Sequence, residues 1–167
     1  MENLIGEGVK IDVSAKASAD RDYLITVDDI RAWETANGKM PEWCIILFQT
    51  GFALRWPNKK TYLGTDQKGP DAVKDLHFPG LHPDAAKWLV ENRKIKAVGI
   101  DTASIDYGQS TDFAAHVALM TNNIPALENV ADMSKLPAKG FHVFAMPMKI
   151  KGGSGGPLRI AAIIPSQ

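Results

Sequence analysis

The sequence has little that would support cross-linking, membrane insertion or binding through bulk charge. It holds one cysteine, Cys44, which excludes an internal disulfide and a cysteine-rich zinc module. Lysine plus arginine and aspartate plus glutamate each number 19, so the formal net charge is zero. A balanced charge argues against non-specific nucleic-acid coating and against docking on acidic lipid. No apolar stretch approaches the ~20 residues that a membrane helix needs.

The first residues also lack the pattern of a secretory signal, because no basic segment is followed by an apolar one. Hydrophobic residues make up 45% of the sequence and charged residues 23%, as in an ordinary globular protein. The length of 167 residues is about that of one domain. We therefore expect a single domain over residues 1–167 in a soluble cytoplasmic protein, with neither membrane nor nucleic acid among its partners.

Apolar patterns typical of strands alternate along the chain with patterns typical of helices. Strands are predicted at residues 9–13, 44–48, 97–100, 124–127, 141–146 and 158–164. Helices are predicted after Thr26, a favourable N-cap, after Pro83, and over about residues 112–121. This alternation predicts a layered α/β domain with a mixed sheet.

Two segments are predicted to be loops. Residues 51–80 are rich in proline and glycine and show no regular period, and loops of this length are usually functional or poorly ordered. The glycine-rich segment 151–156 is predicted to join the last two strands, and it lacks the spacing of a phosphate-binding loop. Its Gly152, Gly153 and Ser154 form either a backbone that a ligand can approach closely or a flexible connection.

The sequence offers only four histidines for metal binding or catalysis. His142 is predicted to be a surface residue at the start of a strand. His77 and His82 lie five residues apart and could share a metal, but no acidic residue around them has a suitable spacing. In a helix over residues 112–121, the fourth, His116, would share one face with Phe113, Val117 and Met120, and that face is predicted to point inward.

Acidic residues follow two of the predicted strands. Asp101 follows the strand at 97–100 and Glu128 follows the strand at 124–127. Ligands bind at the carboxyl ends of strands in α/β sheets. An inward imidazole that faces a carboxylate there can form half of a metal site or an acid–base pair. The alternative is a core histidine with a structural hydrogen bond.

Short motifs distributed over almost the whole chain form a coherent set. They are residues 2–6 (ENLIG), 49–51 (QTG), 78–81 (FPGL), 99–106 (GIDTASID), 108–112 (GQSTD), His116, 124–129 (IPALEN), 149–157 (KIKGGSGGP) and Arg159. Together they resemble the cyclase family, whose members include kynurenine formamidase and isatin hydrolase. The resemblance implies an α/β fold of the swivelling β/β/α type. It also implies hydrolysis of amide or lactam-like bonds with a bound divalent metal, zinc or manganese.

The resemblance also implies roles for individual residues. His116 and Glu128 match metal ligands with catalytic roles, and the substrate-binding candidates are Gln109, Gly152, Gly153 and Ser154. The family's principal metal motif, His-x-Gly-Thr-His-x-Asp, does not occur in this sequence, in which no histidine precedes His77. A catalytic zinc-type site needs about three protein ligands. We therefore expect an N-terminally truncated, incomplete cyclase-like domain that does not assemble the metal site alone and holds no metal by itself.

Two functions follow from this expectation. The first is a non-catalytic, structural or assembly role, in which self-association into a homo-oligomer covers the surface left open in a shortened domain. The alternative is an active arylformamidase-like hydrolase of a small-molecule amide. In that case the missing metal ligands come from another chain or from a longer parent.

Overall fold

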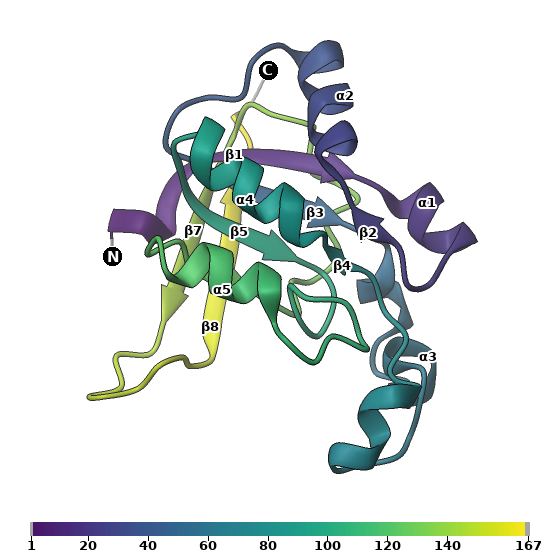
Figure 1. The fold of residues 1–167 in the computed structure, drawn as a ribbon. Coiled ribbons are helices and arrows are strands. Elements are labelled where there is room, and N and C mark those ends of the chain that lie inside the picture. Colours follow the sequence, from purple (N-terminus) through teal and green to yellow (C-terminus); the bar gives the residue numbers. More distant parts are fainter. Residues whose placement is uncertain (1, 166–167) are drawn as a thin grey trace.

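The computed structural model describes residues 2–165 and shows a mixed β-sheet with helices packed on it (Figure 1). The main sheet has six strands in the order β6-β5-β3-β1-β7-β8. Their bounds are β1 Ile5–Asp12, β3 Cys44–Gln49, β5 Ile95–Ile100, β6 Ala126–Leu127, β7 Phe141–Pro147 and β8 Leu158–Ile163. A second, two-stranded sheet pairs β2, Leu24–Ile25, in parallel with β4, Gly80–Leu81. The predicted α/β class with a mixed sheet is confirmed.

Four strands of the main sheet run in the same direction, and apolar side chains are buried on both faces of the sheet. Strands β1, β3, β5 and β6 run parallel, whereas β7 is antiparallel to β1 and β8 is antiparallel to β7. Every residue of β3 is buried. Cys44, Ile46 and Phe48 belong to one core cluster, and the alternate residues Ile45 and Leu47 belong to the other. The central strand is therefore covered on both faces, as its continuous apolar run predicts.

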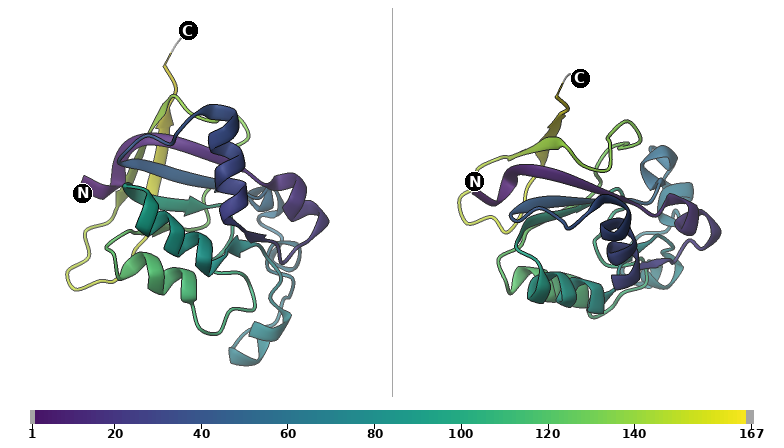
Figure 2. Two further views of the ribbon diagram at one scale, coloured as in Figure 1. Left: turned by 45° about the horizontal axis from the view of Figure 1, so that its top comes forward. Right: turned by 90° about the horizontal axis from the view of Figure 1, so that it is seen from above.

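Five α-helices and three short 3-10 helices connect the strands within residues 2–165. They are η1 Glu2–Leu4, α1 Ser14–Ala19, α2 Val27–Asn37, η2 Phe52–Arg55, α3 Lys59–Leu63, η3 Pro70–Asp75, α4 Pro83–Asn92 and α5 Ala114–Met120. Figure 2 shows α4 and α5 side by side on one face of the main sheet. Helix α2 begins with a capping box between Thr26 and Asp29, which confirms the predicted N-cap. None of the helices described is long and apolar enough to cross a membrane.

Residues 51–80 do not form the single long loop that was predicted. They fold into η2, α3 and η3, and Phe52, Tyr62 and Phe78 bury their side chains together with Ala17 in a separate apolar cluster. These helices are shorter than the 11–18 residues over which a helical period can be recognised. The segment is therefore an ordered lobe beside the sheet.

The inward face predicted for α5 is wrong. The helix buries Ala115 and Leu119, whereas the exposed fractions of Phe113, Val117 and Met120 are 55%, 60% and 46%. Phe113 does not extend the helix, because its backbone is left-handed with φ 50°. Ala115 and Leu119 form the buried stripe of α5, and the small side chain of Ala115 permits the helix to pack closely against the core. His116 lies on the flank of that stripe and is partly exposed.

Candidate functional site

The carboxyl ends of the parallel strands meet at one edge of the main sheet, and polar side chains gather there. Gln49 ends β3, Asp12 ends β1, and the Nε2 atom of Gln49 donates to Oδ2 of Asp12 at 2.9 Å. Asp101 follows β5 and Glu128 follows β6. This carboxyl edge is the place where ligands bind in many α/β sheets.

The structure brings His116 and Glu128 together at this edge. The Nε2 atom of His116 lies 3.1 Å from Oε1 of Glu128, and each side chain is 29% exposed. The same Oε1 atom accepts a hydrogen bond from the backbone nitrogen of Ile105 at 2.9 Å. The backbone amide thus holds the carboxylate toward the imidazole. That the two side chains are metal ligands stays a prediction.

Asp106 completes the cluster on the other side of the imidazole. Its Oδ2 atom is hydrogen-bonded to Nδ1 of His116, and its Oδ1 atom accepts from the backbone nitrogen of Ala115 at 2.8 Å. The carboxylate is 4% exposed. It therefore caps the first turn of α5 and also orients the imidazole ring of His116. In the sequence, Asp106 stands out only as the last residue of the motif at 99–106, because no spacing rule links it to His116.

The two carboxylates change the protonation of His116. Hydrogen bonds to Asp106 and then to Glu128 raise the pKa of His116 to about 9, although burial opposes them. Burial pushes the pKa of Asp106 upward, but hydrogen bonds from His116 and Ala115 outweigh it and hold that pKa below its usual value. At neutral pH the ring is an imidazolium that donates to both neighbours. A metal can bind Nε2 only after that proton has left.

The spacing between His116 and Glu128 suits two ligands of one cation. Metal–ligand bonds of about 2.0–2.2 Å place two adjacent ligand atoms roughly 2.8–3.6 Å apart, depending on whether the ligand angle is octahedral or tetrahedral. The observed 3.1 Å separation lies in this range, and Asp106 holds the ring as carboxylates hold metal-bound histidines. Within residues 2–165, no group of three His, Cys, Asp or Glu residues can hold a metal ion. The described residues therefore fit part of a metal site and do not complete one.

Asp101, the other acidic residue at a strand end, has a structural environment. It is 1% exposed, and its carboxylate accepts from the backbone and hydroxyl of Thr50 at 2.7 and 2.6 Å and from the nitrogen of Gly51 at 2.9 Å. Burial raises the pKa of Asp101, and the hydrogen bonds from Thr50 oppose that shift. These contacts anchor the start of η2 at the carboxyl edge.

Tyr62 connects the lobe of residues 51–80 to the candidate site. Its hydroxyl donates a hydrogen bond of 3.0 Å to Oδ1 of Asn129, the residue that follows Glu128 in the sequence. Burial raises the pKa of Tyr62, and the charges of Asp101 and Glu128 act in the same direction. The hydroxyl is therefore neutral and fixes the turn that presents Glu128.

Gln109 contacts another histidine. Its Nε2 atom lies 3.2 Å from the carbonyl oxygen of Lys74, to which it donates, and 3.2 Å from Nδ1 of His77. His77 in turn lies 2.7 Å from Oδ2 of Asp22. No hydrogen bond among the described residues joins Gln109 to the His116 cluster. Its predicted role in substrate binding stays a prediction.

The glycine-rich loop lies beyond the amino ends of the parallel strands, at the opposite end of the sheet from the His116 cluster. Gly152, Gly153 and Ser154 are exposed in the connection between β7 and β8. Phe144 of β7 pairs with Ile5, the first residue of β1, so the end of β7 and the loop extend past the amino end of β1. Glu128 lies beyond the carboxyl ends of the parallel strands. The structure thus does not bring the loop to the His116 cluster, and its predicted substrate contacts would need a ligand bound elsewhere.

The remaining histidines have separate environments. The Nδ1 atom of His82 accepts from the backbone nitrogen of Asp84 at 3.0 Å and caps α4, ahead of Pro83 in the first turn. His77 instead contacts Asp22, so the possible shared metal gains no support. His142 is exposed on β7, as predicted.

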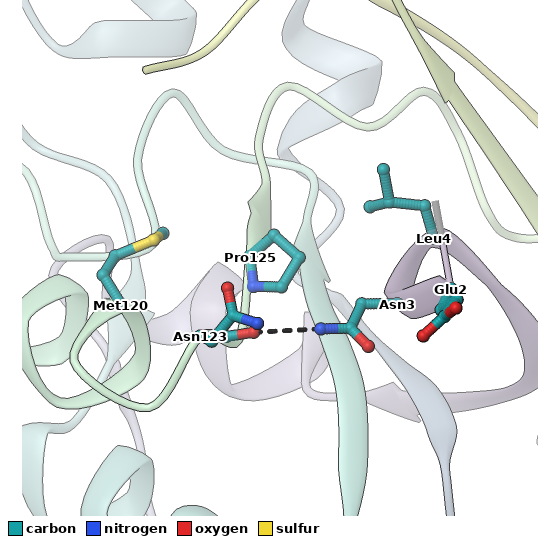
Figure 3. A pocket seen from close by; sticks show the side chains of 6 residues that line it. All are labelled: Glu2, Asn3, Leu4, Met120, Asn123 and Pro125. Atoms are coloured by element: carbon teal, nitrogen blue, oxygen red, sulfur yellow. Dashed lines mark hydrogen bonds between the residues drawn. The ribbon is translucent and has the colours of Figure 1, made fainter.

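A hollow of about 420 Å³ lies between η1 and the residues around the end of α5 and the start of β6 (Figure 3). It is lined by Glu2, Asn3, Leu4, Met120, Asn123 and Pro125, and the Nδ2 atom of Asn3 donates across it to the carbonyl oxygen of Asn123 at 3.1 Å. Because η1 precedes β1 and Pro125 precedes β6, this hollow lies at the amino edge of the parallel strands. It therefore does not serve the His116–Glu128 pair.

Comparisons with known proteins show which family this chain belongs to. The family model for cyclases matches residues 1–107. Isatin hydrolase from Roseibium aggregatum is 35% identical over 171 residues, covering 99% of this chain and 62% of the relative. Kynurenine formamidase from Salinibacter ruber is 27% identical over 159 residues, covering 95% of this chain and 63% of the relative.

A solved structure agrees with these sequence similarities. Isatin hydrolase A from Ralstonia solanacearum matches with a TM-score of 0.89 and 33% identity, covering 98% of this chain and 62% of that chain. The chain thus spans about 62% of the length of these isatin hydrolases. His116 and Glu128 lie outside the residues that the family model matches but inside the isatin hydrolase similarity. The chain belongs to the cyclase family and is related to metal-dependent hydrolases such as isatin hydrolase and kynurenine formamidase.

Proposed function

We propose that this chain carries the His116–Glu128 part of a metal-dependent amide or lactam hydrolase, and that the 167 residues alone do not turn over substrate. The observation that carries the proposal is the 3.1 Å approach of His116 Nε2 to Glu128 Oε1, with the ring held by Asp106. The names of the relatives support an aromatic cyclic amide or a formamide as substrate.

The residues of the cluster have distinct tasks in this proposal. His116 and Glu128 would hold a divalent metal, zinc or manganese, which when bound supplies an activated water and polarises the amide carbonyl. Asp106 accepts the Nδ1 proton of His116 and keeps Nε2 directed at the site. The Ile105 amide fixes one oxygen of Glu128, and the partly exposed carboxylate can exchange a proton with substrate.

A non-catalytic, structural or assembly role is the second candidate. It is favoured by the lack of a three-ligand group within residues 2–165. In that role the Asp106–His116–Glu128 cluster serves only to fasten α5 to the strand ends. Removing either ligand candidate would then change stability and no reaction.

The first experiment uses the chain of 167 residues. Its zinc and manganese content is measured by mass spectrometry after dialysis, and hydrolysis of isatin and N-formylkynurenine is followed by absorbance. We expect far less than one metal per chain and no turnover. Stoichiometric metal with turnover would show that the chain completes its own site, and this part of the proposal would be wrong.

The second experiment tests whether His116 and Glu128 can work in a complete site. In a chimera, the chain replaces the matching part of the Roseibium isatin hydrolase, and isatin hydrolysis is measured. We expect activity, and we expect His116→Ala or Glu128→Gln to lower kcat/KM by about 100-fold or more. His142→Ala, which changes an exposed histidine on β7, is the matched control and should leave kcat/KM unchanged. A folded, metal-loaded chimera without activity would favour the non-catalytic candidate.

A further inference from the structure

We propose that Lys10 and an apolar pocket beside it form a binding site for a small aromatic carboxylate of one ring. Lys10 belongs to β1 and is only 9% exposed. Its Nζ atom donates to the carbonyl oxygen of Met133 at 3.3 Å, and no ion pair within residues 2–165 includes it. Lysine is almost never buried this far without an anionic partner. The buried ammonium therefore favours an anion as the ligand.

The carboxylates around Lys10 are engaged with other groups. Asp12 follows two residues later on β1, and its Oδ2 atom accepts from Nε2 of Gln49 at 2.9 Å. Asp132 is exposed and accepts from the backbone nitrogen and the hydroxyl of Ser134, both at 2.9 Å. These hydrogen bonds from Ser134 lower the pKa of Asp132 most, and the charge of Lys10 adds a smaller effect. Neither carboxylate forms an ion pair with the ammonium.

The pocket has a volume of about 140 Å³ and lies between residues 130–136 and the strands β3, β7 and β8. Nine of its ten lining residues are apolar, and the exception is Asp132. The lining residues that belong to the second core cluster or pack against it are Leu47, Val130, Met133, Leu136, Val143 and Ile160. An apolar cavity of about 150 Å³ holds a benzene molecule. The pocket therefore fits one aromatic ring.

Two contacts place the ammonium at the border of this pocket. Lys10 pairs with Leu47 in the register of β1 and β3, so the two side chains lie side by side on one face of the sheet. Met133, whose carbonyl oxygen accepts from Nζ, lines the pocket as Leu47 does. Ala131 and Ala162, which also line it, are exposed, so the pocket opens to solvent. A ring that enters it can therefore direct a carboxylate toward Lys10.

Gln49 offers a second polar atom at the same end of the sheet. It follows Leu47 by two residues on β3, so its side chain points to the same face, and it is 8% exposed. Its Oε1 atom is buried and accepts no hydrogen bond from the described residues. A buried acceptor without a donor costs free energy, which a hydroxyl or amino group on the ligand ring would recover. We therefore expect the ring to carry such a group.

This site is separate from the His116–Glu128 pair. Leu47 belongs to one core cluster, whereas Ala115 and Leu119 of α5 belong to the other, so α5 packs on the opposite face of the main sheet. No lining residue of the pocket belongs to the Asp106–His116–Glu128 cluster. The inference therefore does not depend on the proposed function, and its test needs neither metal nor turnover.

The test is isothermal titration calorimetry of the chain with benzoate and, in parallel, with benzyl alcohol, a neutral molecule of similar size. We expect one benzoate per chain with a Kd of about 1 mM or lower, at least tenfold below that of benzyl alcohol. Lys10→Met keeps the length of the side chain without its charge and should remove this difference. Lys96→Met is the matched control, because Lys96 also donates from a strand to a backbone carbonyl oxygen but does not line the pocket.

A second pair of variants tests the pocket and leaves Lys10 in place. Ala162 pairs with Val143 across β7 and β8, so Ala162→Leu should fill the pocket and abolish the binding of both molecules. Ile163→Leu, a change on the same strand outside the lining residues, should leave both Kd values unchanged. Circular dichroism checks that each variant is folded.

The three isomers of hydroxybenzoate test Gln49. At least one isomer should bind more tightly than benzoate, and Gln49→Leu should remove that gain. If no isomer binds more tightly than benzoate, Gln49 is not part of the site.

Three results would overturn the proposal as a whole. The first is the absence of saturable benzoate binding at millimolar concentrations. The second is equal binding of benzoate and benzyl alcohol to the unchanged chain. The third is benzoate binding that survives both Lys10→Met and Ala162→Leu, which would place the ligand elsewhere on the molecule.

Discussion

The Nε2 atom of His116 lies 3.1 Å from Oε1 of Glu128, although one residue belongs to a helix and the other follows a strand. Parallel pairing of β6 with β5 delivers Glu128 to the carboxyl edge of the sheet. Asp106 holds the first turn of α5 at the same edge. The pair therefore depends on the position of a helix terminus relative to a strand end.

We predict that Asp106→Ala destabilises the protein by about 1–3 kcal/mol, because it leaves the buried amide of Ala115 and the partly buried imidazole of His116 without their acceptor. Unfolding by urea, followed by circular dichroism, measures the change. Asp112→Ala, in the exposed part of the same loop, is the control and should stay within about 0.5 kcal/mol of the unchanged chain. Equal stability of both variants would show that Asp106 does not anchor α5.

Cys44 should be unreactive in the folded protein. It is fully buried in β3, and burial raises the pKa of its thiol to about 12. The thiolate is the reactive form, so a chromogenic disulfide reagent should label no thiol in the native state and one thiol per chain in urea. Rapid labelling of the native protein would contradict the buried position of β3.

Gly8→Ala should destabilise the sheet. A Cβ atom at this position would lie 2.1 Å from the ring of Phe141, which is fully buried. We expect a loss of about 1–3 kcal/mol in urea unfolding, the usual cost of overpacking a core. Gly155→Ala is the matched control, since a Cβ atom there meets no atom within 4 Å. A neutral effect of Gly8→Ala would place β1 and β7 farther apart than described.

The ion pair between Glu34 and Arg93 should make stability depend on acid pH. Arg93 donates two hydrogen bonds to Glu34, at 2.8 and 2.5 Å, and both side chains are largely buried. These hydrogen bonds hold the pKa of Glu34 below its usual value. The pKa of Glu34 is lower in the folded protein than in the unfolded chain. The ion pair therefore stabilises the folded protein at pH values above the usual pKa of glutamate, and this stabilisation is lost as the pH falls through the lowered pKa.

The measurement for this pair compares urea unfolding of the unchanged chain and of Glu34→Gln across the acid range. Near neutral pH we expect Glu34→Gln to be less stable by about 1–3 kcal/mol, and the difference should shrink as the pH falls below the usual pKa of glutamate. Arg31→Ala, an exposed arginine on the same helix, serves as the control. A difference that is constant with pH would show that the pair is not ionic.

Local patterns in the sequence are sufficient for much of the fold. The continuous apolar run at Cys44 predicts a strand buried on both faces, and Thr26 and Pro83 predict the starts of α2 and α4. These signals work because caps, prolines and hydrophobic runs act on neighbouring residues. The resemblance to the cyclase family, carried by short motifs, is confirmed by the match over residues 1–107.

Other features could not be derived from local patterns. A helical period groups Phe113, Val117 and Met120 correctly on one face, but it does not say whether that face is buried or exposed. The short helices of residues 51–80 have no period long enough to detect. Asp106 shares no spacing rule with His116, and the distance of the glycine-rich loop from Glu128 follows only from the register of β7 against β1.

The sequence by itself determined the alternation of strands and helices and the family, and it predicted the two side chains, His116 and Glu128, that would bind a cation. Only the tertiary structure decided that these side chains meet, that Asp106 holds the imidazole between two carboxylates, and that one apolar face of α5 remains open. The reason is physical. Caps and hydrophobic periods arise from interactions within a few residues, whereas a site and a surface depend on how distant elements pack.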